Sequence, residues 1–423
     1  MNVLFVTKEH PGRLGPLAYE LAKSPDWHCE FLCEYSAGPA DAEGVHRYRP
    51  EKAKAGHGPH FVTRLYDQQV RDAEAIYDAA RSTCRRTPDV VVDAAGTGSC
   101  LPLGDLFRCP VVGYFEYFHQ PGKAAPHARA RQEMSEEERL RLRTANAAVL
   151  LDLVNCDCGF TSTAFQHSLL PKEFSYKVRV LFEGCDVDAF RRRSDAPRVI
   201  GQKRIGPQTR IVTYLGNRLN ATSGYETFME VAAEIVQRHP DVVFAVCGTD
   251  VPAPTVEGKP AESVKQRFQR ERKAEAARFI FLEDLKPAEL AALLSITDLA
   301  IHLTVPAAPA PAFIAAMACE CVVLGSDVAP VREFIRHRQN GLLAGLYSSM
   351  ALADEAVRVL KAPGDYRMLG ARARAFVVQH LSLQVTVPRF RQLLLSAGDR
   401  LPDQFAFEAV ALEAQEESAN EGS

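Results

Sequence analysis

Short apolar runs alternate with segments of helical periodicity along most of this chain. The runs lie at residues 2–6, 28–33, 90–92, 178–182, 210–215, 242–247, 279–282, 299–304 and 321–324. Apolar strands of this length, separated by helices, are typical of parallel sheets that helices cover on both faces. The pattern therefore predicts an α/β protein with doubly wound sheets.

The helical segments are recognised by apolar residues spaced three or four positions apart. The longest spans 62–86 and is predicted to bury one face, made of Leu65, Val70, Ala73, Ile76 and Ala79/Ala80. One helix is predicted over 136–153, and another over 312–319 follows the Pro/Ala-rich loop 305–311. This loop is a candidate anion site, because it joins the carboxyl end of a parallel strand to a helix N-terminus.

Composition shifts divide the chain into two similar halves. We predict a first domain at 1–190, a basic and proline-containing linker at 191–206, and a second domain at 207–382. A helix at 383–397 is expected to cross back to the first domain. The end, 398–423, is acidic and rich in small residues, which predicts a disordered tail.

Composition and charge exclude several classes of function. A net charge of −3 without a basic stripe argues against a nucleic-acid surface. The chain has no apolar run of transmembrane length and its start lacks the features of a signal peptide, so a cytoplasmic protein is expected. The 11 cysteines show no C-x-x-C spacing, which favours buried thiols in a reducing compartment over disulfides or a metal site. No metal or other cofactor is expected.

The segment 298–343 carries a recognisable motif, MAC-x-CVV-x-GSDVAPVREFI followed by NGLL. This pattern resembles the donor-site region of retaining glycosyltransferases of family 4. The resemblance extends over nearly the whole chain, from Met1 to about Ser396. It implies the GT-B architecture, in which two Rossmann-like domains, an acceptor-side domain followed by a nucleotide-sugar donor domain, face each other across a central cleft.

The resemblance also implies where the site residues lie. Arg218 in GNRLNATSG matches the catalytic arginine of the family, and Glu116 in FEYF matches a strand-end carboxylate. Glu116 fits equally well as a partner for a buried tyrosine or a backbone amide. The positions expected to contact the donor are Gly12, Arg13, Gly96, Arg218, Gly248, Ala312 and Met317.

Four family positions have lost their functional groups. Ala94 occupies the position of a histidine in the family, and Ser223 occupies that of a lysine. Ala307 and Ala315 occupy the positions of a pair of glutamates. These losses predict weaker neutralisation of the leaving diphosphate and weaker binding of the nucleotide ribose. Pro309 and Pro311 also lack the N–H groups that a phosphate cradle uses.

The resulting hypothesis is a family 4-like protein of surface glycan or protein glycosylation whose catalysis is impaired or lost. It would take a nucleotide-sugar donor and a glycan, lipid-linked or protein acceptor, with attachment to the inner face of a membrane left open. The alternative is a non-catalytic partner subunit or binding module of a glycosylation system, associated with another glycosyltransferase. A nucleotide-sugar epimerase ranks third, because it too needs acidic and basic groups in the cleft.

Overall fold

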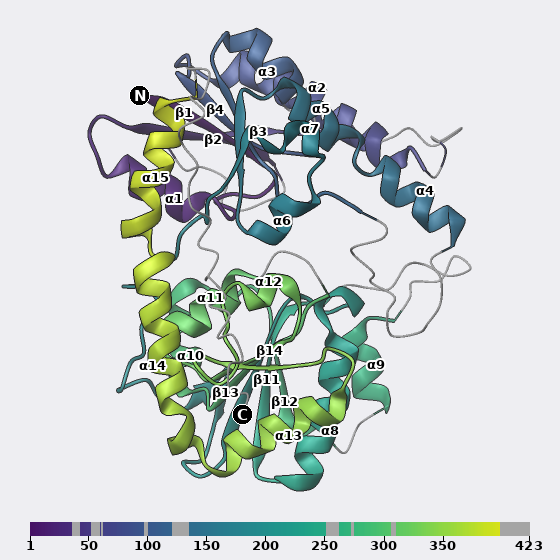
Figure 1. Ribbon diagram of the computed structural model, residues 1–423, viewed down its shortest axis with the longest axis vertical. Coiled ribbons are helices and arrows are strands. Elements are labelled where there is room, and N and C mark those ends of the chain that lie inside the picture. Colours follow the sequence, from purple (N-terminus) through teal and green to yellow (C-terminus); the bar gives the residue numbers. More distant parts are fainter. Residues whose placement is uncertain are drawn as a thin grey trace, which may run out of the picture.

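The apolar runs form two large sheets in which neighbouring strands pair in parallel (Figure 1). The computed structural model describes residues 1–35, 43–51, 60, 62–96, 100–120, 135–250, 262–271, 275–305 and 310–397. The first sheet has seven strands in the order β3-β2-β1-β4-β5-β6-β7, and the second has six in the order β12-β11-β10-β13-β14-β15. The predicted class, two doubly wound α/β domains, is confirmed.

The first half contains the seven-stranded sheet and the helices that cover it. Its strands are β1 (Asn2–Thr7), β2 (His28–Glu34), β3 (Val45–Tyr48), β4 (Val90–Ala94), β5 (Val111–Tyr114), β6 (Cys158–Thr161) and β7 (Val178–Val180). Its helices are α1 (Gly15–Ala22), α2 (Arg64–Thr83), α3 (Cys100–Phe107), α4 (Glu136–Thr144), α5 (Ala147–Asn155), α6 (Ala164–Leu169) and α7 (Lys172–Ser175).

The second half begins after a small antiparallel pair, β8 (Val199–Ile200) and β9 (Lys203–Arg204). Its sheet consists of β10 (Arg210–Arg218), β11 (Val242–Thr249), β12 (Phe279–Leu282), β13 (Leu299–His302), β14 (Val323–Ser326) and β15 (Leu342–Ala344). The intervening helices are η1 (Ala221–Ser223), α8 (Tyr225–Arg238), α9 (Val264–Glu271), η2 (Ala276–Arg278), α10 (Pro287–Ile296), α11 (Pro311–Ala318), α12 (Ala329–Arg332) and α13 (Ser349–Lys361). The chain ends in two long helices, α14 (Pro363–His380) and α15 (Leu383–Leu395).

The strand β1 shows why these sequences are apolar without interruption. Val3 and Phe5 pack into the core on one face of the sheet, and Leu4 and Val6 pack into the core on the other face. Successive side chains of a strand point to opposite faces, so a strand covered on both sides has no position left for a solvated polar side chain.

The strand order reverses direction at one point in each sheet. In the first sheet this point lies between β1 and β4, and in the second between β10 and β13. The connecting segments leave a crevice at such a point, beyond the carboxyl ends of the two strands. Each half therefore has one position at which its fold favours ligand binding.

Two crossing segments connect the halves and pair with each other. Residues 181–190 lead from the first half to the second, and α14 and α15 lead back, as the long yellow-green helices in Figure 1 show. The Cys185 N–H donates to the Leu381 carbonyl at 2.8 Å, and the Leu383 N–H donates to the Cys185 carbonyl at 3.0 Å. Gly184 makes this approach possible, because a Cβ there would lie 2.5 Å from the Thr386 hydroxyl.

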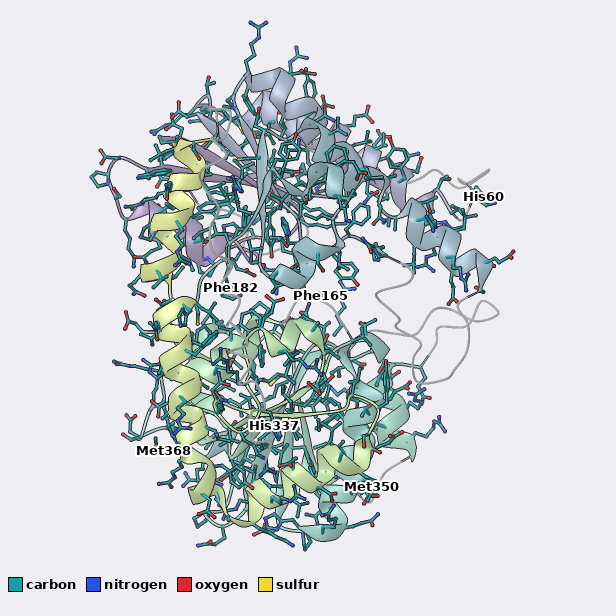
Figure 2. The ribbon with its side chains drawn as sticks, viewed as in Figure 1. His60, Phe165, Phe182, His337, Met350 and Met368 are labelled. Atoms are coloured by element: carbon teal, nitrogen blue, oxygen red, sulfur yellow. The ribbon has the colours of Figure 1, made fainter. Side chains whose placement is uncertain are left out.

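A second contact joins the halves away from the crossing segments. The Glu333 carboxylate accepts hydrogen bonds from the backbone N–H groups of Ala164 and Phe165, at 2.8 and 2.6 Å. The ring of Phe182 lies edge-on to that of Phe334, with 5.9 Å between centroids. Figure 2 labels Phe165 and Phe182 where the two halves approach each other.

Two helix predictions were wrong in detail. The α2 helix ends at Thr83, and Leu65 and Val70 are each 50% exposed rather than buried. Its buried stripe instead includes Gln69 and Asp72, because Gln69 donates to the Gly96 carbonyl and the Asp72 carboxylate lies 3.7 Å from the Lys8 amine. A periodicity read from apolar residues alone misses such a polar inner face.

The predicted helix over 136–153 is two helices, α4 and α5. The break lies at Asn146, which is buried and whose side chain bonds to both the N–H and the carbonyl of His119, each at 2.8 Å. No residue of α4 is buried, so that helix has no apolar face to continue into α5.

Replacing Phe390 of α15 by alanine should destabilise the protein by about 3–5 kcal/mol. Phe390 is fully buried, with ring centroids 6.5 Å from Phe5 and 5.2 Å from Phe160, so alanine would leave a cavity in the first half. Leu395→Ala is the matched control on the same helix, because Leu395 is 64% exposed. Denaturant unfolding measures both variants, and equal losses would mean that α15 does not complete this core.

Candidate functional site

A cavity of about 730 Å³ lies between the two halves and receives residues from both reversal points. From the first half it is lined by the turn after β1, the ends of β4 and β5, and the crossing segment around Glu183. From the second half it is lined by the turn after β10, the end of β13 and the start of α11. Its volume is in the range of pockets that hold small molecules.

The wall formed by the first half is built around Arg13. Its guanidinium donates to Glu116 at 3.0 Å and to the Tyr114 hydroxyl at 3.2 Å, and lies 3.5 Å from Glu183. Gly12 allows the turn that presents Arg13, because its φ is +58° and a Cβ there would lie 2.8 Å from the Glu9 carbonyl. The cluster brings two predicted site residues, Arg13 and Glu116, into direct contact.

Electrostatics fixes the charge state of this cluster. Burial acts to lower the pKa of Arg13, but Tyr114, Glu183 and Glu116 outweigh it and raise that pKa. Burial, followed by the charge of Glu183, raises the pKa of Tyr114. Arg13 therefore stays cationic and shares its charge between two carboxylates, so this cluster is net negative toward the cavity.

The wall formed by the second half carries Arg218 at the end of β10. The register between β10 and β11 shifts between Leu215 and Arg218, at this end of the strand. Arg218 is exposed and lines the cavity. Within the residues that the structure describes, no carboxylate pairs with its guanidinium, so its charge faces the cavity without compensation.

Two of the four altered family positions also lie on the cavity wall. Ala94 lines it at the end of β4, and Ser223 lines it in the turn η1, where the Ser223 hydroxyl donates to the Asn220 carbonyl at 2.9 Å. Ala315 is 2% exposed within an apolar core and is not part of the lining. Ala307, like Pro309, lies outside the described residues.

Four positions expected to contact a donor do not line the cavity. Gly96 follows β4, and its N–H donates to the Asp152 carboxylate. Gly248 packs against the end of β10, since a Cβ there would lie 3.0 Å from the Gly216 carbonyl oxygen. Ala312 and Met317 pack into the apolar core under α11, whose cavity-facing residues are instead Pro311 and Ile314.

Two buried polar residues on the wall were not predicted from the sequence. Glu183 is 5% exposed and its Oε2 has no hydrogen-bond partner among the described residues. His302 is 3% exposed and its Nε2 likewise has none. His302 ends the apolar strand β13 and Glu183 comes shortly after β7, so a polar residue at a strand's carboxyl end was the available signal.

The described part of the chain offers few other chemical features. It holds no group of three or more His, Cys, Asp or Glu residues arranged to bind a metal ion, and its cysteines are free thiols. None of the helices described in the structure is both long enough and apolar enough to cross a bilayer.

Two family models together match most of the chain, each over one segment. Residues 25–190 match the model of the "Glycosyl transferase family 4 group", and residues 197–376 match that of "Glycosyl transferases group 1". The boundary between the two matches falls in the segment that leads into β8.

A curated relative is similar over a shorter stretch. N-acetyl-alpha-D-glucosaminyl L-malate synthase of Bacillus anthracis is 28% identical over 116 residues, which is 27% of this chain. The match spans 30% of that relative's length.

Solved structures share the fold over nearly the whole chain. Sucrose-phosphate synthase from Thermosynechococcus elongatus has a TM-score of 0.70 at 18% identity, covering 94% of this chain and 98% of its own. HepE of Anabaena, in complex with UDP and glucose, has a TM-score of 0.66 at 14% identity, covering 94% and 100%. The expected GT-B architecture is thereby confirmed.

Replacing Arg13 by methionine should destabilise the protein by about 3 kcal/mol, because Glu183 would remain buried without its cation. Arg332→Met is the matched control, since Arg332 pairs with Asp327 at the surface and such pairs contribute at most about 1 kcal/mol. Adding Glu183→Gln to Arg13→Met should recover part of the loss. Equal effects of Arg13→Met and Arg332→Met in denaturant unfolding would contradict a structural role for the cluster.

Proposed function

This chain belongs to the glycosyl transferases of the family 4 group and of group 1, and we propose that it binds a nucleotide sugar in the central cavity. The observation that carries the proposal is Arg218, an exposed cation at the reversal point of the second sheet that pairs with no carboxylate of the described residues. A nucleotide sugar has a diphosphate that such a cation would neutralise, and it fits a cavity of about 730 Å³.

The charges of the two walls support one orientation of the ligand. The diphosphate would lie against the second half, beside Arg218 and the start of α11, where Ala310 and Pro311 line the cavity. The first half lines the cavity with four acidic residues and two basic ones, namely Glu9, Glu116, Glu183 and Asp186 against Lys8 and Arg13, and carboxylates repel phosphate. Hydroxyl-bearing groups, including those of an acceptor, would therefore lie toward the first half.

Transfer would break the bond between the sugar and the diphosphate and leave negative charge on the latter. Arg218 would stabilise that charge as it develops. The neighbouring position that holds a lysine in the family is Ser223, and the histidine position is Ala94; both line the cavity here without a charge. We therefore propose that turnover is slow, with a glycan, lipid-linked or protein acceptor.

The uncharged residues Ser223 and Ala94 favour a second function. In it the protein binds a nucleotide sugar without turning it over and serves as a partner subunit in a glycosylation system.

Isothermal titration with UDP, GDP, ADP and their glucose conjugates tests donor binding. UDP-glucose comes first, because HepE has been solved with it. Release of free nucleotide, with and without acceptors, then separates the two functions. L-malate is the first small acceptor to test, given the name of the curated relative. Binding without release would favour the partner subunit.

Replacing Arg218 by alanine should weaken nucleotide-sugar binding about 10- to 100-fold, because a charge-assisted contact to the diphosphate is lost. Any measurable nucleotide release should fall by about 100- to 1000-fold. Arg367→Ala on α14 is the control, since Arg367 is exposed and does not line the cavity. If Arg218→Ala binds as tightly as the wild type, the diphosphate does not lie beside this residue.

Replacing Ser223 by lysine should strengthen nucleotide binding about threefold to tenfold, because it adds a second cation to the same wall. The Tyr214 hydroxyl would keep its bond to the Ser223 backbone carbonyl at 2.6 Å, so the turn should survive the change. Ser223→Met, of similar length without the charge, is the comparison. Equal binding by the lysine and methionine variants would show that position 223 does not face the phosphates.

A further inference from the structure

His302 is a buried histidine at the reversal point of the second sheet. It is the last residue of β13, it is 3% exposed, and it lines the cavity. Its ring stacks on Phe313 of α11, with 4.7 Å between centroids and 25° between planes. Packing against Phe313 and the adjoining strand therefore holds the ring in one orientation.

The hydrogen bond to β10 determines the tautomer of the ring. Nδ1 lies 2.9 Å from the Leu215 carbonyl oxygen, which can only accept, so Nδ1 carries the proton and donates. Burial lowers the pKa of His302 to about 4, and the bond to Leu215 opposes this only in part, so the ring is neutral near pH 7. In a neutral ring with a protonated Nδ1, Nε2 is an acceptor.

That acceptor lacks a partner within the described residues. Nε2 is buried, and none of their donors reaches it. A buried polar atom without a hydrogen bond is costly, so a site that leaves one on a cavity wall favours a ligand that supplies the missing donor. The required ligand group is an O–H or N–H.

We propose that Nε2 of His302 accepts a hydrogen bond from a carbohydrate hydroxyl of the bound nucleotide sugar. The inference rests on the proposed function and names a residue that positions the donor. Both phosphates of a nucleotide sugar are diesters whose oxygens carry no proton near neutral pH, so they cannot be the partner of this nitrogen. The hydroxyl belongs either to the ribose or to the sugar to be transferred.

Two substitutions separate the acceptor from the structural role of the ring. In His302→Asn the side-chain amide can still donate to the Leu215 carbonyl, but it is too short to place an acceptor where Nε2 lies. In His302→Gln the amide oxygen extends to about that position. His337→Asn is the matched control, because His337, labelled in the second half in Figure 2, is exposed and is not among the residues that line the cavity.

The experiment measures the dissociation constant of each variant by isothermal titration. Two probes are used. The first is whichever of UDP-glucose, GDP-glucose and ADP-glucose binds the wild type most tightly, and the second is the corresponding nucleoside diphosphate. His302→Asn should weaken binding of the nucleotide sugar roughly threefold to tenfold. His302→Gln should stay within about twofold of the wild type, and His337→Asn should bind unchanged. Thermal unfolding establishes that each variant is folded.

The two probes identify the hydroxyl. If His302→Asn weakens binding of the nucleotide sugar and of the nucleoside diphosphate equally, the hydroxyl belongs to the ribose. If it weakens binding of the nucleotide sugar alone, the hydroxyl belongs to the transferred sugar. A folded His302→Asn that binds both probes like the wild type overturns the inference and leaves the proposed function intact. A wild type that binds none of the three nucleotide sugars overturns the proposed function itself.

Discussion

Parallel strand pairing is the constraint on which the rest of this structure depends. Because the paired strands of each large sheet run the same way, their carboxyl ends lie along one edge, and the connecting turns gather there. The two halves present these edges to each other, so the turns after β1 and β10 line a common cavity. Residues far apart in sequence, such as Arg13 and Arg218, thus come to face the same space.

The two cations differ in what surrounds them. Arg13 is held by two carboxylates and a tyrosine, and it pairs with the buried Glu183. Arg218 has no such partner among the described residues and is available to a ligand. Equal formal charges therefore give opposite walls, one net acidic and one basic, and that asymmetry orients any ligand with a charged end and an uncharged end.

Much of the fold follows from local sequence, because a strand buried on both faces must be apolar at every position. The side of α2 that is buried does not follow from local sequence. Its inner face includes Gln69 and Asp72, whose partners come from other parts of the chain. The break at Asn146 likewise depends on the backbone of His119. Within the site, the turn that carries Arg218 is recognisable from its motif. The role of His302 is not, because it follows from a carbonyl 87 residues away and from the absence of a described donor.

The position of α15 has a consequence for how the protein is synthesised. Leu383, Val387, Phe390 and Leu394 belong to a core otherwise made by β1, α1 and neighbouring strands of the first half. During translation, the ribosome releases those strands long before it makes the helix that covers them. The first half therefore cannot complete its core as it emerges, although amino-terminal domains commonly fold first. The apolar surface that α15 covers in the finished protein stays uncovered until that last segment is made.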